Sequence, residues 1–168
     1  MQDVQSRPDS RGIDIQKVGV KNVHLPLQIA TKEGGWQSVL GNASLSVELP
    51  MQFKGTHMSR FIEVLLSWSQ KPISNVSITS ILKETCEALS ATKAHISIRF
   101  KYFVPKSAPV SGKESILDYN CEFSGAVDGS RHTFIMGVEV PVTSCCPCSK
   151  EISSFGAHNQ RTMVRARV

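Results

Sequence analysis

The chain has 168 residues, 40% of them hydrophobic and 20% charged, and this size and composition predict one soluble globular domain with a real core. The formal net charge is +5, but the basic residues are scattered, which argues against a basic tail that binds nucleic acid or lipid. A site for an anionic, phosphorylated ligand is the functional alternative to a merely solvated basic surface.

The first 22 residues (1–22) are predicted to form a polar N-terminal arm, because the opening MQDVQSRPDSRGID lacks the apolar core of a signal peptide. No window reaches the roughly 18 consecutive apolar residues of a membrane span. These two observations predict a cytoplasmic protein with no membrane partner. In a reducing compartment the five cysteines are expected to be thiols or metal ligands rather than a disulfide framework, and their odd number agrees.

Two strands are predicted after the arm. Residues 23–30, VHLPLQIA, contain a proline, which favours an edge position or a bulge. After the turn TKEGGWQS, the segment NASLSVELP alternates between apolar and polar residues. This period of two residues predicts a half-buried strand whose apolar side chains are Ala43, Leu45, Val47 and Leu49.

Two consecutive helices are predicted next, because the spacing of the apolar residues changes to about 3.6. The first helix has Thr56 as its expected N-cap and an apolar stripe made of Met58, Phe61, Ile62, Leu65 and Leu66. The second has Ser77 as a candidate cap and a stripe made of Ile78, Ile81, Leu82, Cys86 and Leu89. Cys86 is therefore expected to act as a small buried hydrophobe.

Three alternating segments predict three more strands: AHISIRFKYF, ILDYNCEFSGAV with Cys121 on its apolar face, and HTFIMGVEVPV. Short turns between neighbouring strands predict antiparallel pairing, with the two helices on one face of the sheet. This order is typical of an α+β layer rather than a βαβ pattern. The final TMVRARV alternates until it stops, so we expect another strand and a longer parent protein.

The segment VTSCCPCSKEISSFGAHNQR, residues 142–161, carries three cysteines within four positions. Cys145 and Cys148 have the C-x-x-C spacing of redox sites, but such sites need a parallel βα setting that this pattern does not supply. A closed structural zinc site needs four ligands, and Cys145, Cys148 and His158 supply three at most. A loop without chemistry is the remaining plain interpretation.

An open metal site agrees better with this segment. One thiolate at the end of a strand can bind a divalent metal and leave a position for water, whose pKa the metal lowers to about 7. His158 can move protons near neutral pH, and Lys150 is a cation suited to a phosphate or a developing anion. The spacing alone does not decide which of the three thiols binds the metal.

The motifs PVTSCCPCSKEISSFGAHNQR, KGTHMSRF at 54–61 and KSAPVSGKESILDYNCEFSG at 106–125 resemble the type IB GTP cyclohydrolase I family, over essentially the whole chain. The resemblance implies a tunnelling fold (T-fold), whose unit is two antiparallel strands, two helices and two more strands. It implies a first unit at 23–127 and, at 128–168, the start of a second, incomplete unit that carries the active-site loop. The remaining metal ligands and a carboxylate that anchors the pterin are then expected beyond Val168.

The resemblance also implies a function. Such enzymes convert GTP and water into 7,8-dihydroneopterin triphosphate and formate, the first step of tetrahydrofolate biosynthesis, with a divalent metal (Mn, Zn or Fe). By position in the motif, Cys146 is the implied metal-binding and catalytic thiolate, His158 its companion in proton transfer, and Lys150 a substrate contact. Cys148 is implied to support the loop. Members are homo-oligomers with active sites at subunit interfaces.

Two alternatives stay open beside this function. A related cyclohydrolase acts on GTP but gives a pterin with a cyclic phosphate, and a non-catalytic protein would use the CCPC loop to hold zinc or to respond to redox state. Relatives usually carry an apolar residue where this chain has Cys145, so this extra thiol is expected to compete for metal or to oxidise. If the molecule ends at Val168, we expect little or no activity. No recognition motif supports a nucleic-acid partner.

Overall fold

The structure is a computed structural model that describes residues 12–168, within which there are a seven-stranded sheet and three helices. The elements are, in chain order, β1 (Ile15–Ala30), β2 (Trp36–Leu49), α1 (Met58–Ser69), β3 (Pro72–Ile73), α2 (Asn75–Leu89), β4 (Lys93–Ser107), β5 (Glu114–Asp128), β6 (Arg131–Cys145), α3 (Pro147–Ile152) and β7 (Asn159–Arg167). This architecture confirms the predicted α+β class.

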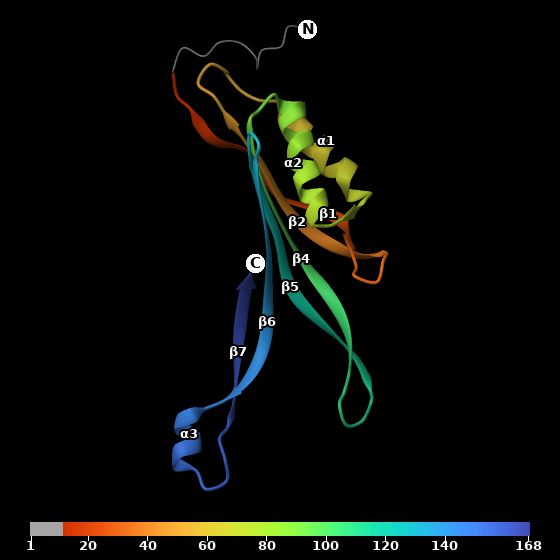
Figure 1. Cartoon of the computed structure of the whole chain (residues 1–168), viewed down its shortest axis with the longest axis vertical. Coiled ribbons are helices and arrows are strands. Elements are labelled where there is room, and N and C mark those ends of the chain that lie inside the picture. The colour runs from red at the N-terminus through yellow and green to blue at the C-terminus, as the bar shows by residue number, and fades with distance from the viewer. Residues whose placement is uncertain (1–11) are drawn as a thin grey trace.

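The strands lie in the order β3-β1-β2-β4-β5-β6-β7 across the sheet. Every neighbouring pair is antiparallel except β1 with the two-residue β3. Figure 1 shows α1 and α2 against one end of the sheet, while the β4–β5 and β6–β7 hairpins extend away from the helices. The short helix α3 lies at the far tip of the β6–β7 hairpin.

The core lies between α1, α2 and the face of the sheet that they cover. The predicted alternation of β2 is confirmed, because Ala43, Leu45, Val47 and Leu49 are all buried. The same face continues on β4 through Ile96, Ile98 and Phe100, which are also buried. Gly125 on β5 lets α2 approach closely, since a Cβ there would lie 2.6 Å from Cγ2 of Ile78.

Two details of the helix prediction are wrong. In α1 the buried residues are Phe61, Val64, Leu65 and Ser69, so the buried stripe is rotated from the predicted one. Leu66 and Met58 are 55% and 44% exposed. The helix contacts β1 and α2 on the side that carries Phe61 and Leu65, which turns Leu66 outward by about 100°.

The helix caps differ as well. His57, not Thr56, is the N-cap residue of α1, and Ser74, not Ser77, is that of α2. Ser77 takes the third position of a capping box, where its Oγ accepts a hydrogen bond from the Ser74 N–H at 3.1 Å. A sequence pattern of several serines does not show which one adopts the extended backbone of a cap.

Strand β1 begins at Ile15, eight residues before the predicted start. Its pairing with β2 shifts register twice, between Ile15 and Val18 and between Val20 and Val23. These irregularities break the alternation that identifies a strand in the sequence, which explains the late predicted start.

Residues 1–11 of the predicted N-terminal arm lie outside the described residues. No helix in the described part of the chain has the length and apolar character that a membrane crossing requires.

Candidate active site

The CCPC segment occupies the connection between β6 and β7. Cys145 is the last residue of β6, Cys146 is the N-cap of α3, and Pro147 and Cys148 are its first two helical residues. Proline suits this first position because its fixed φ is already helical and its missing N–H would have no intrahelical partner. The sequence therefore turns from strand to helix directly at the cysteines.

Two backbone hydrogen bonds bring the predicted site residues into one loop. The Cys146 N–H donates to the carbonyl of His158 at 3.2 Å, and the Lys150 N–H donates to the carbonyl of Cys146 at 3.1 Å. Cys145 is paired with Asn159 at the end of the β6–β7 ladder. The antiparallel pairing of β6 with β7 thus brings His158 next to Cys146, although twelve positions separate them in the sequence.

The side chains of this loop are open to solvent. Cys145 and Cys148 are exposed, Cys146 is half-buried, and α3 has no buried residue. Nδ1 of His158 lies 3.4 Å from the carbonyl oxygen of Asn159. The loop also carries Phe155, which is fully exposed. The arrangement offers reactive groups at a surface and does not enclose them in a pocket.

The donor types in the loop, thiol and imidazole, suit a zinc-like or iron-like divalent metal. The described residues nevertheless do not complete a metal shell, because residues 12–168 contain no group of three or more His, Cys, Asp or Glu side chains placed to hold an ion. The fit is therefore partial. The loop presents a thiol and an imidazole on neighbouring backbone segments.

The other two thiols, those of Cys86 and Cys121, are less accessible than the loop thiols Cys145 and Cys148. Cys86 and Cys121 are half-buried and pack against the core, as their positions on apolar faces predicted. Burial raises the pKa of both thiols, and Glu87 adds to the effect at Cys86. Their thiolate fraction at neutral pH is accordingly low.

In the folded protein, we expect iodoacetamide to label Cys145 and Cys148 about tenfold faster than Cys86 and Cys121 at pH 8. The loop thiols are exposed, whereas burial restricts access to Cys86 and Cys121 and raises their pKa values. Timed labelling followed by peptide mass spectrometry measures each rate, and labelling in concentrated urea is the control, where the difference should disappear. Faster labelling of Cys121 than of Cys148 in the folded state would contradict the structure.

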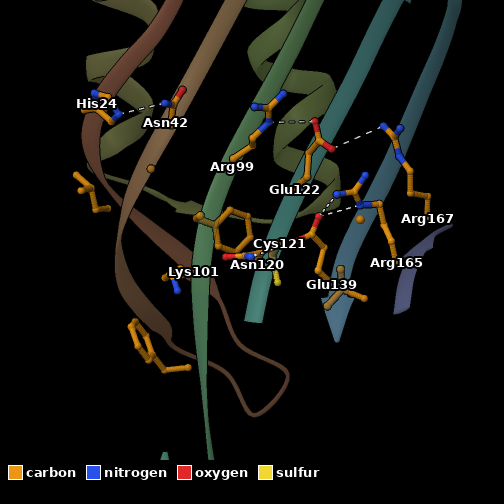
Figure 2. A pocket seen from close by; sticks show the side chains of 16 residues that line it. His24, Asn42, Arg99, Lys101, Asn120, Cys121, Glu122, Glu139, Arg165 and Arg167 are labelled. Carbon is orange, nitrogen blue, oxygen red and sulfur yellow. Dashed lines mark hydrogen bonds and ion pairs between the residues drawn. The ribbon is translucent and has the colours of Figure 1, made fainter. Parts of the chain in front are cut away.

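A hollow that the sequence interpretation missed lies on the opposite face of the sheet from α1 and α2. It has a volume of about 750 Å³ and is lined by residues from β1, β2, β4, β5, β6 and β7. Figure 2 shows its charged side chains, among them Arg99, Lys101, Arg165 and Arg167. The sequence does contain one signal: Arg99 and Lys101 are two positions apart, as are Arg165 and Arg167. This i, i+2 spacing places both cations of each pair on one face of a strand.

Comparisons with known proteins place the chain in a family. The family model described as "Type I GTP cyclohydrolase folE2" matches residues 1–168. The protein named GTP cyclohydrolase FolE2 of Magnetococcus marinus is 51% identical over 168 residues, which cover 100% of this chain and 63% of the relative. The protein of the same name from Azoarcus sp. is 50% identical over 163 residues, covering 96% of this chain and 60% of the relative.

A third relative, GTP cyclohydrolase FolE2 of Geotalea uraniireducens, is 47% identical over 168 residues, or 100% of this chain and 61% of its own length. The chain thus spans about three fifths of the length of these curated relatives. The resemblance found in the sequence is confirmed at the level of GTP cyclohydrolases, and the matching description names no subtype IB. The chain belongs to the type I GTP cyclohydrolase folE2 family.

Proposed function

We propose that this protein is a GTP cyclohydrolase, which converts GTP and water into 7,8-dihydroneopterin triphosphate and formate in tetrahydrofolate biosynthesis. The observation that carries the proposal is the family match over all 168 residues, and the relatives at 47–51% identity bear the name of this activity. The hydrogen bond between the Cys146 N–H and the His158 carbonyl supports it, because it joins the two halves of the family motif.

Within this proposal, Cys146 is the catalytic thiolate and the metal ligand from this chain. His158 is the group that moves protons, since an imidazole can both accept and donate one. Lys150 is the cation that attracts the substrate's phosphates or a developing negative charge. Its backbone N–H donates a hydrogen bond to the carbonyl of Cys146, which keeps the two backbones close together. Mn, Zn or Fe is the proposed metal; when bound, it would supply a Lewis acid. Because the described residues do not complete its ligand set, Cys146 is the one ligand assigned here.

The finer fold assignment, a type IB enzyme with a T-fold, is also a proposal. The order β1, β2, α1, α2, β4, β5 supports it, because it repeats the unit of two strands, two helices and two strands. The proposed limits are 23–127 for the first unit and 128–168 for the start of the second. A cytoplasmic homo-oligomer with active sites at interfaces is the proposed state. All nine residues of β7 are exposed at the edge of the sheet, where a further strand can pair.

The test is turnover of GTP by the purified full-length protein with Mn, Zn or Fe. We expect formate release together with a product whose mass is that of 7,8-dihydroneopterin triphosphate. A product with the mass of a cyclic phosphate would assign the protein to the related cyclohydrolases instead. Two results together would favour the non-catalytic zinc module. The protein would show no turnover with any metal, and its loop thiols would resist labelling until a chelator is added.

A further inference from the structure

The polar face of the sheet carries a charged hollow that lies apart from the CCPC loop. Six charged side chains line it: the cations Arg99, Lys101, Arg165 and Arg167 and the carboxylates Glu122 and Glu139. Its volume of about 750 Å³ is within the range of small-molecule sites. Four cations against two carboxylates leave an excess of positive charge, and a concave surface concentrates that potential.

Two of the four cations already have a carboxylate of their own. Arg165 Nε donates to Glu139 Oε1 at 2.8 Å, and Asn120 Nδ2 donates to Glu139 Oε2 at 3.1 Å. The hydrogen bond from Asn120, followed by that from Arg165, lowers the pKa of Glu139. Lys101 is paired with Asp118, which is not one of the residues that line the hollow. One positive charge therefore remains in excess at Arg99 and Arg167, which have a single carboxylate, Glu122, between them.

Arg99 and Arg167 share one carboxylate. Arg99 Nε lies 3.8 Å from Glu122 Oε1, and Arg167 Nη2 lies 3.7 Å from Glu122 Oε2. Figure 2 shows the two guanidinium groups on opposite sides of this carboxylate. Glu122 itself is held from β4 by Ser97, whose Oγ donates to Oε1 at 2.9 Å. One negative charge thus stands between two positive ones.

The two guanidinium groups retain most of their hydrogen-bonding capacity. Their contacts to Glu122 are longer than hydrogen bonds, and within the described part of the chain neither group forms a hydrogen bond to protein. Each guanidinium has five N–H donors in a planar fork that suits phosphate oxygens. The Arg99 and Arg167 side chains are 74% and 54% exposed, so these donors are accessible to a ligand.

The register of the sheet leaves room between the two arginines. Arg99 is opposite Glu122, Glu122 is opposite Gly137, and Gly137 is opposite Arg167, which makes one row across β4, β5, β6 and β7. Gly137 adds no side chain to this row. A Cβ there would lie 3.5 Å from Glu122 Cβ and 3.8 Å from Arg167 Cγ, in ordinary van der Waals contact, so the missing side chain leaves a gap between these two neighbours.

We propose that this hollow binds a small phosphate-type anion, which Arg99 and Arg167 hold above Gly137. The ligand is a phosphate, a pyrophosphate or the phosphate chain of a nucleotide, all of which present the same oxygens to the two guanidinium groups. The eight steps from Gly137 to Cys145 rise by roughly 26 Å along β6, so the anion lies far from the Cys146 loop of the same chain. The site goes beyond the proposed cyclohydrolase activity and does not depend on it.

The test is calorimetric titration of the full-length protein with sodium pyrophosphate at low ionic strength. We expect Arg99→Ala and Arg167→Ala each to weaken binding by about tenfold, because each removes a charged hydrogen-bond donor. Arg131→Ala, at the exposed β5–β6 turn, removes the same charge outside the hollow and should leave the affinity unchanged. Glu122→Gln, which removes the negative charge between the arginines, should tighten binding.

Three results would overturn the site: no binding of pyrophosphate at millimolar concentration, equal affinities of the Arg99, Arg167 and Arg131 variants, or weaker binding by Glu122→Gln. Parallel titrations with inorganic phosphate and with GTP identify which source of phosphate the hollow prefers. Formate release by Arg99→Ala at saturating GTP separates this site from the proposed function. Unchanged release with weakened pyrophosphate binding supports a separate site, and a lack of release by the unaltered protein affects only the cyclohydrolase proposal.

Discussion

We expect Cys146→Ala to abolish the proposed release of formate from GTP, lowering the rate by roughly 10³-fold or more, because it would remove the proposed metal ligand. The loss should be chemical rather than structural. Cys146 is the N-cap of a six-residue helix with no buried residue, and its hydrogen bond to His158 uses the backbone N–H, which alanine keeps. Formate and pterin assays on the full-length protein with each metal measure the effect, and an unchanged melting temperature shows that the fold is intact.

Cys148→Ala is the matched control for this experiment. It removes an identical thiol two residues further along, in the same short helix, from a side chain that is already exposed. We expect this variant to keep most of the activity and the same melting temperature. Full turnover by Cys146→Ala, or an equal loss in both variants, would show that the motif position was assigned to the wrong thiol.

The elements that the sequence predicts well are those with an unbroken period. β2 and β4 alternate without interruption against a covered face, and each alternation corresponds to a buried row in the structure. The first eight residues of β1 were missed because register shifts interrupt the alternation. Helix α3 was missed because six residues are too short to show a helical period.

Of the candidate functional sites, the CCPC loop was predicted from the sequence and the charged hollow was not. A local motif contains Cys146, Lys150 and His158, and the pairing of β6 with β7 does bring their backbones together. The i, i+2 spacing indicates which cations share a face of one strand, but it does not locate the hollow, because Arg99 and Arg167 come from strands that are not adjacent in the chain. Only the order β4-β5-β6-β7 brings them into one row with Glu122. The sequence does not show which cations share a carboxylate.

Leu65→Ala should destabilise the protein by about 3 kcal/mol, whereas Leu66→Ala should change the free energy of unfolding by less than about 1 kcal/mol. The two leucines are neighbours in α1, and the periodic pattern assigned both to the core. In the structure Leu65 is 3% exposed and Leu66 is 55% exposed. Truncating Leu65 removes apolar atoms from the interface with the sheet and leaves a cavity, while truncating Leu66 removes atoms that water already surrounds.

Urea unfolding followed by circular dichroism measures both variants against the unaltered protein, with the midpoint and slope fitted separately. Because the two substitutions are identical and lie in the middle of the same helix, the change in helix propensity is the same in both. It cancels in their difference, which therefore reports burial alone. Equal losses in the two variants would mean that α1 presents the face predicted by its sequence period rather than the face that the structure shows.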